Sequence, residues 1–164
     1  MTDIVKQASI AAERARYEHW GDKLPVDPAR IADSLGIKVV EAYLDPDVAG
    51  AIQQNPGEQA IIYVSAADHA NRKRFTCAHE IGHYVKRGDS SEALGYIDYR
   101  DEAASMGIDE DERYANAFAA ALLMPERDVE RLHLLDASEE EMARRFGVSQ
   151  VAMVNRLKNL NLYR

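Results

Sequence analysis

The apolar positions of the first half of the chain change from helical spacing to strand-like spacing. Residues 3–19 repeat apolar side chains every three or four positions, which predicts a helix. Asp27 followed by Pro28 is typical of a helix start, and this short helix should end near Gly36. Three segments rich in β-branched side chains then predict strands, at residues 37–43, 48–53 and 59–64.

The second half of the chain is mainly helical in its spacing. Residues 66–86 predict a helix that ends at Gly88. Residues 88–108 show weak periodicity and predict a long loop, and a loop of that length favours a functional role. A further helix is predicted over residues 109–124, because Pro125 stops the pattern there.

The rest of the chain predicts two or three short helices, with breaks near Asp136 and at residues 147–149. Helices, then strands, then helices indicate an α+β fold, with a small antiparallel or mixed sheet beside a central helix. We expect residues 1–125 to form the main domain. Residues 126–164 should form a helical, helix-turn-helix-like extension that packs on it.

Two histidines on the predicted helix 66–86 are spaced for metal binding. His79 and His83 are four residues apart, so they lie on one face, one turn apart. Zn²⁺ binds imidazole nitrogen in tetrahedral geometry, and a catalytic site needs three protein ligands and one open position. Glu80 lies beside the first histidine, and it can reach a water molecule bound at the open position of the zinc ion without binding the metal itself.

A chance match to this short pattern is the alternative, but its neighbours argue against chance. They are apolar or small, as on a buried helix: Phe75, Ala78, Ile81 and Gly82. Glycine costs a helix roughly 1 kcal/mol relative to alanine. The glycine at position 82 therefore makes sense where another segment packs closely against the ligand helix.

The third ligand has to come from another element, and the predicted helix 109–124 offers a carboxylate. Its apolar face is formed by Ala115, Ala119, Leu122 and Leu123, and Glu112 lies in the middle of that face. A carboxylate there is costly unless it is paired or bound to a metal. Glu112 is therefore our third ligand, the alternative being a solvated helix start. Asn116, one turn later, could orient a ligating histidine, or it could simply be exposed.

Two strings together resemble a known family. Residues 74–84 read RFTCAHEIGHY, and residues 112–125 read ERYANAFAAALLMP. They resemble the ImmA/IrrE metallopeptidases, as does the looser string IADSLGIKV at residues 31–39. The resemblance covers about residues 25–160. Cys77 stands where the family more often has an aliphatic residue, and we expect it to pack rather than bind metal.

The resemblance implies a zincin-like fold of the gluzincin type, with Zn²⁺ on two histidines and a glutamate. It also implies a regulated bacterial or phage protein. Several members cleave a helix-turn-helix repressor and so release transcription, which makes such a repressor the expected partner.

The chemistry expected at this site is hydrolysis of a peptide bond. Glu80 would take a proton from the attacking water as general base and then return it to the leaving amine. A donor should stabilise the oxyanion. Tyr84 is one candidate, although a tyrosine there can equally belong to the core. We also expect the substrate to bind in extended form along an exposed strand, with residues 59–64 as the first choice.

Charge and composition exclude some classes of function. The net charge of −8 argues against a general affinity for nucleic acid or anionic membranes. Residues 126–164 hold seven acidic and seven basic side chains, and this neutral balance argues against direct DNA binding by their helix-turn-helix pattern. Cys77 is the only cysteine, and there is neither a signal-peptide core nor a membrane span. These features predict a soluble cytoplasmic protein.

Three hypotheses follow for function. The first is a zinc endopeptidase that cleaves a repressor or another regulatory protein. The second is a zinc-site protein that controls a repressor or toxin partner by association, without proteolysis. The third is a DNA-binding regulator that uses its C-terminal helices. Glu80 favours the first hypothesis over the second, and the neutral charge of residues 126–164 weighs against the third.

Overall fold

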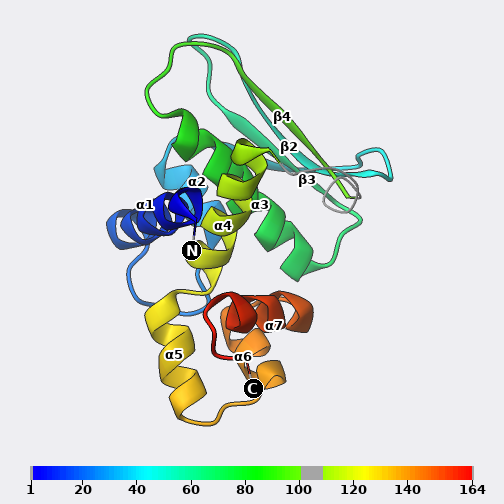
Figure 1. The fold of residues 1–164 in the computed structure, drawn as a ribbon. Helices are drawn as coiled ribbons and strands as arrows, with labels where there is room; N and C mark the ends of the chain where they lie inside the picture. Colours follow the sequence, from blue (N-terminus) through cyan, green and yellow to red (C-terminus); the bar gives the residue numbers. More distant parts are fainter. Residues whose placement is uncertain (1, 101–108, 164) are drawn as a thin grey trace.

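In the computed structural model, residues 2–100 and 109–163 are described, and they form an α+β fold as predicted. A sheet lies along one side of the helices, and the last three helices form a group at the opposite end (Figure 1). The helices are α1 (Asp3–His19), α2 (Pro28–Ser34), α3 (Ala70–Arg87), α4 (Glu110–Leu123), α5 (Glu126–Leu134), α6 (Glu139–Phe146) and α7 (Gln150–Asn159). The strands are β1 (Lys38–Ala42), β2 (Val48–Gln54), β3 (Ile61–Ser65) and β4 (Leu94–Tyr99).

The sheet is small and mixed, and its strand order is β1-β3-β2-β4. Strand β3 runs parallel to β1 and antiparallel to β2, and β2 is also antiparallel to β4. The expectation that residues 59–64 offer an exposed strand is therefore wrong. Both sides of β3 are occupied by neighbouring strands, so its main chain has no free edge for a peptide.

The prediction of a loop over residues 88–108 is also wrong in part, because it contains strand β4. Side chains on β4 alternate between the two faces of the sheet. Leu94 is buried and Tyr96 is half-buried, whereas Ile97 is exposed. The strand lies at the outer side of the sheet, and in the described part of the chain no strand pairs with its outer edge (Figure 1). The remainder of the predicted loop, residues 101–108, lies outside the described residues.

Helix α3 is held closely between the sheet and α4 at two glycines. A Cβ atom on Gly82 would lie 3.0 Å from the Cα atom of Ala115 on α4, which confirms the predicted close packing. A Cβ atom on Gly50 of β2 would lie 2.3 Å from the Cγ2 atom of Thr76 on α3. Both contacts fix α3 against the elements on either side.

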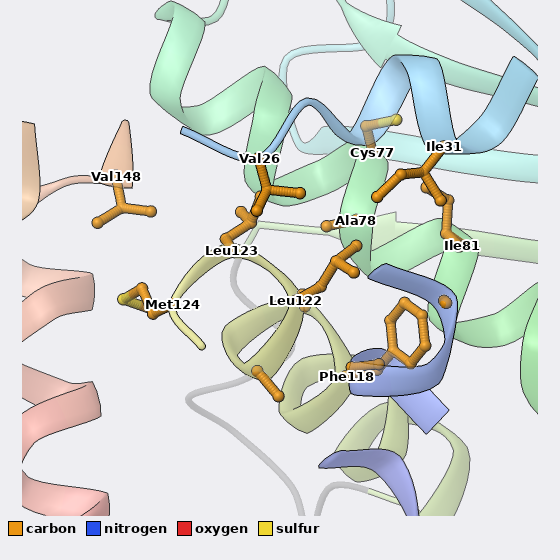
Figure 2. Close-up of a cluster of buried hydrophobic side chains, with 14 of the residues drawn as sticks. Val26, Ile31, Cys77, Ala78, Ile81, Phe118, Leu122, Leu123, Met124 and Val148 are labelled. Atoms are coloured by element: carbon orange, nitrogen blue, oxygen red, sulfur yellow. The ribbon is translucent and has the colours of Figure 1, made fainter. Parts of the chain in front are cut away.

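The buried apolar core continues from the helices near the sheet to the C-terminal helices. Val26, Leu123 and Met124 lie close together, and Val148 from the α6–α7 turn faces Met124 (Figure 2). Arg156 on α7 also donates a hydrogen bond to the carbonyl oxygen of Met124 at 3.1 Å. The division of the chain at residue 125 stays a prediction.

The predicted C-terminal breaks are confirmed, since α5, α6 and α7 are separated at residues 135–138 and 147–149. Ser149 caps α7 by accepting a hydrogen bond from the backbone nitrogen of Ala152 at 3.1 Å. Within the described part of the chain, every helix is too short or too polar to cross a bilayer.

Candidate metal centre

Three of the predicted site residues converge where α3 faces the first turn of α4. The Nε2 atoms of His79 and His83 lie 3.2 Å apart. The carboxylate of Glu112 places Oε2 at 3.3 Å from His79 Nε2 and Oε1 at 3.0 Å from His83 Nε2. Both histidines are buried and Glu112 is half-buried. Asp109 caps α4 by accepting from the backbone nitrogen of Glu112 at 2.8 Å, which fixes the turn that carries this carboxylate.

The spacing of these donor atoms fits a tetrahedral metal ion. With metal–ligand bonds of about 2.0–2.1 Å, neighbouring ligand atoms of a tetrahedron are about 3.3 Å apart. The two imidazole nitrogens are 3.2 Å apart, and each lies 3.0–3.3 Å from one of the two Glu112 oxygens, so these separations are close to that value. Two imidazole nitrogens and a carboxylate also form a donor set that Zn²⁺ accepts. His79, His83 and Glu112 can therefore hold such an ion.

The electrostatics of the cluster keep Glu112 ionised. Hydrogen bonds with His79 and His83 hold the pKa of this carboxyl well below its usual range. Burial opposes a charge on His79, but its contact with Glu112 and the nearby carboxylates outweigh burial, so the pKa of His79 is raised. A metal ion binds imidazole only in its neutral form, so a cation at this site would replace the proton on the imidazole, while the ionised Glu112 would supply a negative ligand.

Glu80 lies beside the cluster and is completely buried. Among the described residues, neither of its carboxylate oxygens has a hydrogen-bond partner. Burial raises the pKa of Glu80 to about 8, while the nearby His79 acts in the opposite direction. A carboxyl with a pKa near the pH of the medium can both accept and release a proton, as a general acid–base group must.

The contact predicted for Asn116 is present. Its Oδ1 atom lies 3.0 Å from Nδ1 of His79, so the imidazole can donate there and direct its Nε2 lone pair towards His83 and Glu112. The role of Asn116 in metal binding stays a prediction.

Tyr84 has contacts with the core and with Arg87. It is half-buried and packs against the hydrophobic core, and the guanidinium of Arg87 lies 5.5 Å from its ring centroid. Its proposed part in stabilising an oxyanion stays a prediction. Cys77 is buried in the core, as expected, near Ile31 and Ala78 (Figure 2).

Sequence reasoning missed three residues at the site, because it missed strand β4. The ring of Tyr96 stacks on His83, with centroids 3.9 Å apart. Asp98 comes within 4.8 Å of both His79 and Glu80, measured between their potential ligand atoms. Asp111 accepts a hydrogen bond of 2.6 Å from the Tyr96 hydroxyl. The aromatic and β-branched side chains at Tyr96, Ile97 and Tyr99 were the signal that could have revealed the strand.

The sequence and the fold both match known proteins. The family described as the IrrE N-terminal-like domain matches residues 32–158. The chain is 34% identical over 102 residues to the radiation response metalloprotease IrrE of Deinococcus radiodurans, an alignment that covers 62% of this chain and 27% of that protein. The chain thus spans about a quarter of the length of this relative. A solved structure of a Mycobacterium tuberculosis transcriptional regulator shares the fold, with a TM-score of 0.64 and 21% identity, over 93% of this chain and 46% of that one.

Proposed function

The chain belongs to the IrrE N-terminal-like family of metallopeptidases, and from this premise we propose that it is a zinc-dependent endopeptidase acting on a regulatory protein. One observation carries the proposal. His79, His83 and Glu112 converge with ligand-like spacing, and a buried carboxyl, Glu80, lies next to them. Family membership alone would not distinguish an active peptidase from a protein that keeps only the fold.

In the proposed mechanism, His79, His83 and Glu112 hold Zn²⁺. When bound, the ion supplies Lewis-acid polarisation of the peptide carbonyl and lowers the pKa of water. Glu80 takes a proton from the attacking water. Burial favours the protonated form of this carboxyl, so Glu80 can keep this proton until the amine leaves and then transfer it. Asn116 holds His79 in the orientation that this arrangement needs.

The substrate segment is proposed to bind in extended form along β4, instead of along residues 59–64. Among the described residues, no strand pairs with the outer edge of β4. Two of its side chains face the centre. Tyr96 contacts His83, and Asp98 lies near Glu80. Main-chain hydrogen bonds to a sheet edge would place a peptide beside Glu80, with selectivity left to side-chain pockets. The resemblance to the ImmA/IrrE proteins suggests a helix-turn-helix repressor as the substrate.

Replacing Glu80 by glutamine tests the chemistry. Glu80→Gln keeps the size of the side chain and removes the base, so zinc content and partner binding should persist. Cleavage should fall by about 10²–10⁴-fold or more, because the general base is lost. The measurement is the amount of an intact candidate helix-turn-helix repressor after co-expression with wild type or mutant.

The same experiment separates the proposed function from its alternative. If Glu80→Gln inactivates the repressor as well as wild type does while the repressor stays uncleaved in both, the chain acts by association and not by proteolysis. The zinc site would then have a structural role.

Metal binding is tested separately by elemental analysis of protein purified without chelators. Wild type should carry about one equivalent of zinc, since three side chains form one site. The double mutant His79→Ala, His83→Ala should carry almost none. His19→Ala, His133→Ala is the matched control, because it also removes two imidazoles but leaves the cluster unchanged. Equal zinc content in both double mutants would contradict the assignment.

A further inference from the structure

The two histidines of the centre are oriented in different ways. His79 has a hydrogen-bond partner for its Nδ1 atom, the Oδ1 atom of Asn116 at 3.0 Å. His83 is equally buried, but its Nδ1 atom has no hydrogen-bond partner among the described residues. A ligating histidine almost always makes such a bond, which fixes the direction of its ring. Another contact must therefore fix the ring of His83.

That contact is an aromatic stack with Tyr96 of β4. The two rings are nearly parallel, with an interplanar angle of 10° and centroids 3.9 Å apart. The ring of His79 meets His83 edge-on, with centroids 4.9 Å apart and an angle of 81°. A rotation of the His83 ring would have to displace one of these two neighbours. Stacked aromatic pairs stabilise each other beyond the burial of their surface.

Tyr96 is in turn held in place by both helices of the centre. Its hydroxyl donates to Oδ2 of Asp111 at 2.6 Å, and Oδ1 of Asp111 accepts from Lys86 Nζ at 2.5 Å. Lys86 lies on α3, three residues after His83, and Asp111 is the neighbour of Glu112 on α4. These hydrogen bonds, which we call the anchor of Tyr96, connect the edge strand to the two helices that carry the proposed ligands.

We propose that Tyr96 is a positioning residue for His83, with its ring replacing the hydrogen bond that orients His79. The hydrogen bond between the Tyr96 hydroxyl and Asp111 keeps this ring stacked on the imidazole. The inference rests on the proposed metal site, and it adds to that site a residue of β4, the strand along which the substrate is proposed to bind. The proposal predicts that the ring and the hydroxyl of Tyr96 contribute separately to zinc affinity, the ring more than the hydroxyl.

Three variants separate these contributions. Tyr96→Leu removes the ring, and Tyr96→Phe keeps the ring without its anchor. Tyr99→Leu is the matched control, because it removes a tyrosine from the same strand at a position that faces away from the centre. Zinc affinity is measured by competition with a chelating dye. The absorption spectrum of the Co²⁺-substituted protein reports ligand geometry independently of peptidase activity, and circular dichroism of the metal-free protein checks the fold.

Tyr96→Leu should weaken zinc binding about 10–100-fold, the effect usual for losing a group that orients a ligand, and should change the Co²⁺ spectrum. Tyr96→Phe should bind zinc less than tenfold more weakly than wild type and should keep the wild-type Co²⁺ spectrum. Tyr99→Leu should match wild type in both measurements.

Several results would overturn the inference. Tyr96→Leu could bind zinc like wild type, or Tyr99→Leu could weaken binding as much as Tyr96→Leu. Tyr96→Phe could be as impaired as Tyr96→Leu, which would show that the stack contributes nothing. A wild-type chain that binds no metal would remove this inference and the proposed function together. Zinc binding with the expected order of variants but without cleavage would leave the inference standing and reject only the peptidase proposal.

Discussion

Some residues near the metal centre matter because they are small, and Gly50 is one of them. Gly50 faces α3 where an added Cβ atom would lie 2.3 Å from Thr76 Cγ2 and 2.8 Å from the carbonyl oxygen of Tyr63. The backbone oxygen cannot move without disturbing the sheet. The approach of β2 to the ligand helix therefore depends on this glycine.

We predict that Gly50→Ala lowers the free energy of unfolding by about 1–3 kcal/mol, because it overpacks the interface between β2 and α3. Gly95→Ala on the adjacent strand is the control. An added Cβ there has no neighbour within 4 Å, so stability should be unchanged or slightly higher. Urea unfolding measures both variants. Equal stability of the two would mean that β2 can move away from α3 at little cost.

Cys77 gives a second prediction at this scale. Its side chain is only 3% exposed, and burial raises the pKa of the thiol to about 12. Since the thiolate is the reactive form, the folded protein should react with a disulfide reagent such as Ellman's reagent far more slowly than the protein in denaturant. Rapid modification of the folded chain would show that α3 opens readily and would contradict a tightly packed ligand helix.

At the scale of elements, Arg74 connects the ligand helix to the C-terminal helices. Its guanidinium donates to the carbonyl oxygens of Val26 at 2.5 Å and Gly147 at 3.0 Å. Gly147 ends α6 in the left-handed conformation, which turns the chain towards α7. One half-buried side chain thus fixes the helix-turn-helix-like unit relative to α3.

We predict that Arg74→Met destabilises the protein by about 1–3 kcal/mol, because it leaves these carbonyl oxygens without their donors. The control is Arg72→Met, because Arg72 is an exposed arginine on the same helix. This substitution should lower the free energy of unfolding by less than about 0.5 kcal/mol. Denaturant unfolding of both variants provides the comparison. If both lose the same stability, Arg74 acts as a surface charge and not as a connection between the elements.

At the scale of the whole molecule, the core is shared across the proposed boundary at residue 125. Met124 precedes that boundary and Val148 follows it, yet both are buried in one cluster that also includes Val26 (Figure 2). Removing residues 126–164 would expose this apolar surface. The C-terminal helices therefore complete the core as well as extend the fold.

We accordingly predict a single cooperative unfolding transition. The fluorescence of Trp20, the only tryptophan, reports on the N-terminal side of the boundary, and far-UV circular dichroism reports on all helices. The two signals should change together with denaturant, as they do in two-state unfolding. A chain truncated after Pro125 should not fold stably. Two separate transitions would instead support two independent units, at residues 1–125 and 126–164.

Local features of the chain were sufficient to predict the three side chains that the structure brings together at the candidate metal centre. The i, i+4 spacing places His79 and His83 on one face of any helix, whatever surrounds it. Glu112 stood out because a carboxylate on an apolar helix face needs a partner. Caps and helix breakers such as Asp27 and Gly147 likewise act within a few residues of chain. These features depend on short-range geometry, so the sequence by itself determined them.

The sheet and everything that depends on it were decided only by tertiary structure. Strand order follows from pairing between segments far apart in the chain, and no local pattern shows that β3 is central and β4 is at the edge. The short segment that contains Tyr96 becomes a strand by pairing with β2, and only this pairing brings the ring onto His83. A contact between two side chains on different elements requires the positions of both elements, which packing sets and sequence spacing does not.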